Sequence, residues 1–77
     1  MILIDNVHMV SDESVAELHA FAERIGMKRC WYKRGHYDVL GTRWWLAVHE
    51  GAVWVPTRTL IRRMASRQRR SYRGREG

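Results

Sequence analysis

Two histidines and two aspartates carry the side chains for acid–base or metal chemistry. In an extended His36-Tyr37-Asp38 segment, alternation would put His36 and Asp38 on one face of a strand and Tyr37 on the other. His8 and Asp12 flank the expected start of the first helix and are the candidates to join that face. Imidazole and carboxylate groups together bind divalent metal ions or exchange protons with a phosphate ester. The candidate catalytic set is therefore His8, Asp12, His36 and Asp38.

Three interpretations of these four residues stay open: structural hydrogen bonds, a metal or catalytic site, and contacts to phosphate or a nucleotide. Their spacing matches no recognised metal motif. A chain of 77 residues also has little material with which to enclose a substrate. We therefore predict a structural role, with no cofactor and no metal ion, and keep an enzyme as the alternative.

The C-terminal end of the chain is strongly basic. Up to Thr57 there are six basic and seven acidic residues, whereas from Arg58 onward there are eight arginines and one acid. Arginine pairs with phosphate through two hydrogen bonds and stacks on bases, so such a cluster favours salt-sensitive binding to nucleic acid. An acidic protein surface, or a purely solubilising tail, is the alternative. The predicted nucleic-acid contacts are Arg58, Arg62, Arg63, Arg67, Arg69, Arg70, Arg73 and Arg75.

Four tryptophans in so short a chain favour a well-filled core, but they do not all fit inside it. Neighbouring helical residues point about 100° apart, so one of Trp44 and Trp45 is expected at the rim. An exposed indole beside a cation suits base stacking or a protein interface. The predicted interface residues are Tyr37, Arg43, Trp44 and Trp45. Cys30 is expected to be a small buried side chain.

A small number of helices and strands must position these residues. Ser14 and Glu17 have the spacing of a capping box, and Gly26 is placed to end the helix that they begin. Thr42 and Thr57 are candidate N-caps of two later helices. The expected elements are a strand over 2–4, a helix over 14–26, a strand over 27–32, a short strand or loop over 36–40, a helix over 43–50, a buried strand over 52–55 and a helix from 57.

This order predicts an α/β fold, β-α-β-α-β-α, with a small single-layer sheet of three or four strands and about three helices. Residues 1–65 are expected to form the compact domain. Apolar residues that would anchor the chain end near Ala65. Residues 66–77 are therefore expected to form an arginine-rich tail that is extended or disordered.

The chain also resembles a known family. The shared residues are His8-Met9-Val10-Ser11-Asp12, Glu17-Leu18-His19-Ala20-Phe21-Ala22, Ile25-Gly26, Trp31, His36-Tyr37-Asp38, Arg43, Ala47 and Gly51-Ala52. They span roughly residues 2–60 and resemble the domain of unknown function family 4031, found in small bacterial and phage proteins. The resemblance implies a phage or prophage origin and supports the same site candidates, but it implies no activity. Family members usually have a longer segment before the first of these histidines.

The single cysteine permits no internal disulfide, which favours a reducing compartment. There is no apolar run of about 18 residues and no secretion signal at the N-terminus, so we expect a cytoplasmic protein, in the host cytoplasm if phage-encoded. The leading hypothesis is a phage-type accessory protein that binds nucleic acid or a nucleoprotein machine such as RNA polymerase. The alternatives are a small metal-dependent or acid–base enzyme acting on a phosphate-containing substrate, and an inhibitor of a host enzyme or defence protein. The oligomeric state stays open.

Overall fold

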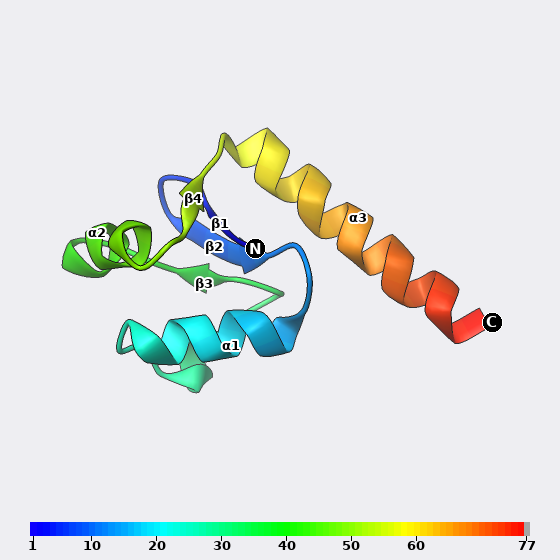
Figure 1. The fold of residues 1–77 in the computed structure, drawn as a ribbon, viewed down its shortest axis with the longest axis horizontal. Coiled ribbons are helices and arrows are strands. Elements are labelled where there is room, and N and C mark those ends of the chain that lie inside the picture. The colour runs from blue at the N-terminus through cyan, green and yellow to red at the C-terminus, as the bar shows by residue number, and fades with distance from the viewer. Residues whose placement is uncertain (77) are drawn as a thin grey trace.

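The computed structural model describes the backbone of residues 1–76 and the side chains of residues 1–70. Figure 1 shows three helices around a small sheet. The elements are β1 (Ile2–Ile4), β2 (His8–Ser11), α1 (Val15–Arg24), a short 3-10 helix η1 (Arg29–Trp31), β3 (Tyr37–Asp38), α2 (Thr42–His49), β4 (Val53–Trp54) and α3 (Thr57–Glu76). The strand order is β3-β2-β1-β4. The predicted α/β class, with four strands and three α-helices among the described residues, is confirmed.

The sheet has helices on both faces. In Figure 1, α1 lies below the strands and the first turns of α3 lie above them. Because strand side chains alternate, Ile4 packs into a core cluster with Leu18 of α1, whereas Leu3 packs with Val10 and Leu60 on the face covered by α3. Neighbouring residues of β1 and β2 therefore lie on opposite faces of the sheet: Ile4 and Met9 pack toward α1, whereas Leu3 and Val10 pack toward α3.

The first helix forms as its sequence predicts. The Ser14 hydroxyl accepts a hydrogen bond from the Glu17 backbone N–H at 3.0 Å, which is the N-cap contact of a capping box. The chain leaves the helix at Gly26, whose φ of +80° is accessible to glycine at little cost. Leu18 and Phe21 of this helix are buried.

The strand β2 is absent from the predicted order. It pairs antiparallel with β1, Met9 opposite Ile4, and antiparallel with β3. Pairing of this kind depends on partners elsewhere in the chain, and with only four residues β2 has little periodicity of its own. The first two strands therefore form a hairpin, and the parallel neighbour of β1 is β4.

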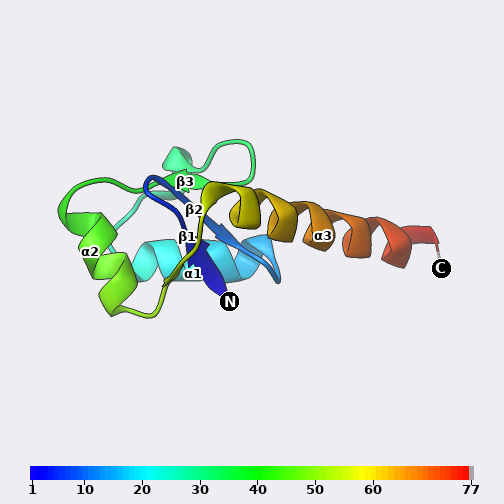
Figure 2. The ribbon, with the colours of Figure 1, turned by 90° about the horizontal axis from the view of Figure 1, so that it is seen from above.

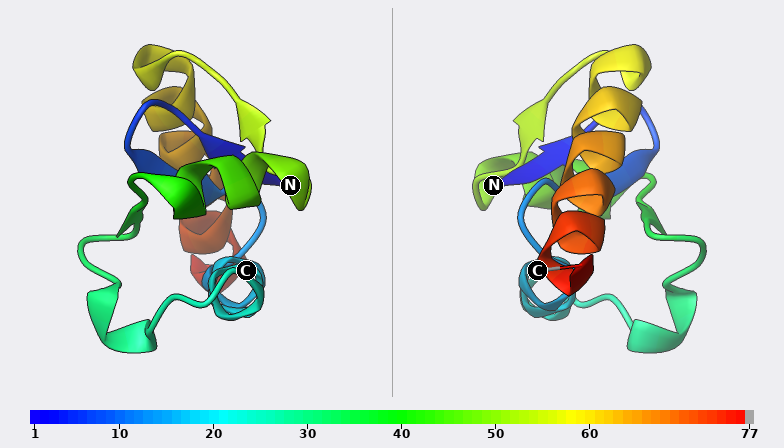
Figure 3. Two further views of the ribbon diagram at one scale, coloured as in Figure 1. Left: turned by 90° about the vertical axis from the view of Figure 1, so that its left-hand side faces the viewer. Right: turned by 90° about the vertical axis from the view of Figure 1, so that its right-hand side faces the viewer.

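Two other predicted strands differ from the structure. Residues 27–32 contain η1, in which the Trp31 N–H donates to the Lys28 carbonyl at 3.0 Å, and Cys30 is exposed. Figure 3 shows this segment bulging away from the strands. The expected buried strand over 52–55 is the edge strand β4, and its two residues, Val53 and Trp54, are exposed.

Helix α3 continues through the segment predicted to be an extended or disordered tail. It projects beyond the sheet in Figure 2 and gives the molecule extents of 42 × 24 × 19 Å. Arg67 anchors it: the side chain is buried and its guanidinium donates to the Ser11 carbonyl at 2.9 Å. A count of apolar residues misses this contact because the anchor is an arginine. Gly77 lies outside the described residues.

None of the helices described over residues 1–76 combines the length and apolar character that a membrane span requires.

Candidate functional site

Three of the four candidate catalytic residues meet on the α3 face of the sheet. Strand alternation puts His36 and Asp38 on this face and Tyr37 on the other, where it is buried. His8 lies opposite Asp38 in the pairing of β2 with β3. One ligand atom from each of His8, His36 and Asp38 lies within 4.8 Å of the other two. We call these three residues the His–Asp cluster.

The contacts within the His–Asp cluster are close. His36 Nε2 lies 3.1 Å from Asp38 Oδ1. The rings of His8 and His36 meet edge to face, with centroids 5.1 Å apart. All three side chains remain accessible, with exposed fractions of 43% for His8, 25% for His36 and 61% for Asp38. The cluster is therefore open to a solute or an ion.

Asp12 does not join the cluster. The residues between it and His8 form β2, so the two lie about 13 Å apart along an extended chain. Asp12 Oδ1 instead lies 3.0 Å from the N-terminal amino group, and its other oxygen lies 3.5 Å from Arg63. Asp12, a candidate for this face, therefore lies outside the cluster because the strand β2 carries it away from His8.

Asp5 takes part at the site, although it is not among the candidate residues that the sequence suggests. Oδ1 accepts hydrogen bonds from the backbone N–H groups of Val7 at 2.8 Å and His8 at 2.6 Å. Oδ2 accepts from the Thr57 hydroxyl at 2.7 Å and lies 3.0 Å from His8 Nδ1. Asp5 thus ties the β1–β2 turn to the start of α3. An aspartate that ends a strand and precedes a turn is the sequence signal for such a role, because its carboxylate can accept from the N–H two residues on.

The surroundings of Asp5 favour its ionised form. Burial raises the pKa of this carboxyl group, but the hydrogen bonds from Thr57, Val7 and His8 outweigh burial and lower the pKa to about 2. An ionised carboxylate accepts hydrogen bonds only. His8 Nδ1 is therefore the donor in its hydrogen bond to Asp5, and this contact leaves the other ring nitrogen, Nε2, without a bond to Asp5.

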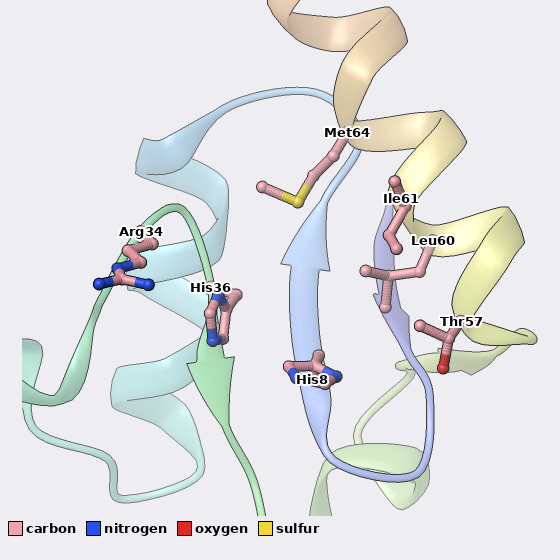
Figure 4. Close-up of a pocket in the computed structure, with 7 residues that line it drawn as sticks. All are labelled: His8, Arg34, His36, Thr57, Leu60, Ile61 and Met64. Atoms are coloured by element: carbon pink, nitrogen blue, oxygen red, sulfur yellow. The ribbon is translucent and has the colours of Figure 1, made fainter.

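A pocket of about 160 Å³ lies beside the His–Asp cluster. Figure 4 shows its walls, which come from β2, from the turn that leads into β3, and from α3. The lining residues are His8, Arg34, His36, Thr57, Leu60, Ile61 and Met64. The pocket thus combines two imidazoles on one side with the apolar side chains of α3 on the other.

A tight turn closes one edge of this pocket. Lys33 and His36 pair across it, and Arg34 and Gly35 both have positive φ, of 50° and 90°, which suits a two-residue hairpin turn. A Cβ atom at Gly35 would lie 2.7 Å from Met64 Cε. Glycine at this position therefore supplies the backbone conformation, and it also leaves room for the terminal methyl group of Met64.

The arginines of α3 fall into two groups. Arg58, Arg62 and Arg69 are exposed and project within about 40° of one another around the helix. We call these three the outer arginines. On the side that faces the sheet, Arg67 donates to Ser11 and Arg70 donates to the Asp12 carbonyl at 2.6 Å. Arg63 also faces this side and contacts the Asp12 carboxylate. The side chains of Arg73 and Arg75 lie outside the described residues.

The four predicted interface residues differ in exposure. Trp45 is 71% exposed, whereas Trp44 is half-buried and donates its indole N–H to the Asp5 carbonyl at 2.8 Å. Arg43 is exposed and stacks over Trp31. Tyr37 is buried, so its assignment to an interface is wrong. Its hydroxyl lies 2.6 Å from His19 Nδ1, and burial raises the pKa of the phenol.

The family resemblance is decided by a direct match. A family model described as "Protein of unknown function (DUF4031)" matches residues 4–67. The chain belongs to this family. No curated protein and no solved structure matches the chain.

The DUF4031 match covers the whole His–Asp cluster but only part of the arginine-rich helix α3. The matched residues 4–67 include Asp5, the whole His–Asp cluster and the structural Arg67. They end before Arg69 and Arg70. The cluster and its pocket therefore belong to the domain that the family shares, whereas part of the arginine-rich region lies beyond it.

Proposed function

We propose that the protein binds nucleic acid, free or within a nucleoprotein machine, through the outer arginines of α3. The observation that carries the proposal is that Arg58, Arg62 and Arg69 are exposed on the side of α3 that faces away from the sheet. Residues 57–70, which form the described part of α3 with side chains, contain no aspartate or glutamate. The three guanidinium groups therefore present an uninterrupted positive face.

The length of this face suits a phosphate backbone. Arg58 and Arg69 are 11 positions apart, which corresponds to about 16 Å along an α-helix. Phosphates along one strand of a duplex are spaced by about 3.4 Å of helix axis, so the outer arginines span roughly five nucleotide steps. Contacts of this kind give sequence-independent affinity that falls as salt is raised.

The charge distribution supports the same partner. The chain up to Thr57 carries one more acidic than basic residue, whereas the remainder carries a net charge of +7. Nucleic acid would therefore be attracted to α3 and not to the α1 side of the sheet. Under this proposal the protein acts as a phage-type accessory protein in the cytoplasm of its host.

The test compares two variants with the same change in net charge. Arg58, Arg62 and Arg69 are replaced by glutamine in one variant, and the exposed Arg24, Lys28 and Arg29 are replaced by glutamine in the control. Fluorescence anisotropy with labelled duplex DNA and labelled single-stranded RNA measures affinity over a series of NaCl concentrations. Loss of three phosphate contacts should lower the slope of log K against log salt by about 2.7 for duplex DNA.

Equal losses in the two variants would show that net charge, and not the outer arginines, governs binding. Absence of binding by the unmodified protein at low salt would overturn the proposal. Point variants are preferable to truncation after Met64, because truncation would also remove the Arg67 anchor.

A further inference from the structure

We infer that the His–Asp cluster is a binding site for a first-row transition-metal ion of the Zn²⁺ type. His8, His36 and Asp38 come from two neighbouring strands and converge on one face of the sheet. The inference is independent of nucleic-acid binding, because the cluster lies on the sheet and the outer arginines lie on the far side of α3. It replaces the structural role that sequence spacing favours, since spacing does not reveal which strands are neighbours.

The donor set selects the class of ion. Two imidazole nitrogens and one carboxylate oxygen suit Zn²⁺ and its neighbours in the first transition row, whereas Mg²⁺ and Ca²⁺ prefer sites made of oxygen. Two His and one carboxylate is a ligand combination of zinc sites that leave a coordination position open. A Zn²⁺ ion is therefore the appropriate first probe.

The distances fit such an ion after small side-chain movements. Ligands about 2.0–2.2 Å from a tetrahedral ion lie about 3.3 Å from one another. His36 Nε2 and Asp38 Oδ1 are already 3.1 Å apart. All three ligand atoms lie within 4.8 Å of one another, so the other separations must shorten by at most about 1.5 Å. The exposure of Asp38 leaves room for this movement.

Asp5 orients His8 for this role. Its carboxylate holds His8 Nδ1 at 3.0 Å, which leaves Nε2 as the ligand atom. A carboxylate bound to the second nitrogen of a ligating histidine is a common support of metal sites, since it sets the tautomer and the ring orientation. Asp5 is itself fixed by the Val7 and His8 N–H groups and by Thr57, so it acts as a positioning residue and not as a ligand.

The site has an accessible coordination position. Three protein ligands leave one position of a tetrahedral ion for water or a small anion. Two of the ligands, His8 and His36, also line the pocket under α3 (Figure 4). We expect the bound ion to have one exchangeable ligand at this pocket, as opposed to the four protein ligands of a purely structural zinc site.

The experiment uses the full chain after treatment with a chelator. Isothermal titration with Zn²⁺ should show one ion per chain, and Co²⁺ should give the visible ligand-field bands of a site with nitrogen ligands. His36→Ala and Asp38→Asn should each weaken Zn²⁺ binding by about tenfold or more and abolish the Co²⁺ bands. Because Asp38 is largely exposed, Asp38→Asn should fold even if a histidine variant does not, and circular dichroism verifies the fold of each variant.

Two matched controls separate this site from other ligands in the chain. His49→Ala removes an exposed histidine on α2, and Cys30→Ser removes the exposed thiol. Neither should change Zn²⁺ affinity, and excess Mg²⁺ should not displace Zn²⁺. Binding that is unchanged in His36→Ala and Asp38→Asn, or that is lost in Cys30→Ser, would overturn the inference. So would the absence of stoichiometric binding in the unmodified protein.

Discussion

The two sides of helix α3 use the same residue type in opposite ways. Toward the sheet, Arg67 is buried and its guanidinium binds the Ser11 carbonyl. Two positions later, Arg69 projects into solvent. A helix turns by about 100° per residue, so two positions are enough to reverse the role of an arginine. The basic composition of this segment therefore mixes structural cations with cations available to a partner, and only the orientation of the helix separates them.

The largest difference in stability between variants on the two sides of α3 should come from its apolar residues. Leu60 is 3% exposed against Leu3 and Val10, whereas its neighbour Ile61 is 59% exposed. Leu60→Ala should lower the free energy of unfolding by about 2–5 kcal/mol, because it leaves a cavity. Ile61→Ala should change it by about 0.5 kcal/mol or less. Urea unfolding of both variants measures the difference, and equal effects would mean that α3 does not dock on the sheet through Leu60.

The second-largest difference in stability should come from substitutions of arginines on the two sides of α3. Arg67→Ala removes a hydrogen bond from a charged donor and the packing of its buried stem, so we expect a loss of about 1.5–3 kcal/mol. Arg69→Ala should have an effect within about 0.5 kcal/mol. Conversely, Arg69→Ala should weaken nucleic-acid binding more than Arg67→Ala does. Thermal and urea unfolding check the first expectation, and anisotropy checks the second. A stable Arg67→Ala protein would show that the helix needs no anchor beyond Met64.

The Asp5 contact to α3 should give the stability a specific pH dependence. Its pKa is lowered from 3.8 to about 2 in the folded protein, so the folded state binds fewer protons than the unfolded chain between these values. The stabilisation is therefore complete above about pH 4 and is lost as the pH falls through about 2. It amounts to about 2 kcal/mol. Urea unfolding over this range should show the loss, and Asp5→Asn should reduce it.

The smallest expected loss of stability concerns the single hydrogen bond between Asp5 and Thr57. Thr57→Val keeps the side-chain shape and removes the hydroxyl that donates to Asp5 Oδ2. We expect a loss of about 1.5 kcal/mol in the free energy of unfolding, typical of a hydrogen bond to a charged group. The neighbouring Thr59→Val is the control, since no side-chain hydrogen bond of Thr59 is found among the described residues. Similar losses in the two variants would contradict the proposed link between the β1–β2 turn and α3.

Local sequence patterns determined the features that depend on neighbours in the chain. Ser14 and Glu17 predict the start of α1 because capping joins residues three positions apart. Alternation in an extended segment puts His36 and Asp38 on one face and Tyr37 on the other. The spacing of Trp44 and Trp45 likewise leaves one of them exposed. Each pattern is satisfied within a few residues, so it is visible without a fold.

Tertiary structure alone decided which distant residues meet. The pairing of β2 with β3 brings His8 to His36 and Asp38, and it carries Asp12 away to the other end of the strand. The docking of α3 turns Arg67 inward and joins Thr57 to Asp5. These contacts join residues up to 56 positions apart, and no periodicity connects such positions. They follow from strand pairing and from burial of the whole chain. The sequence alone therefore could not show which residues make up the site.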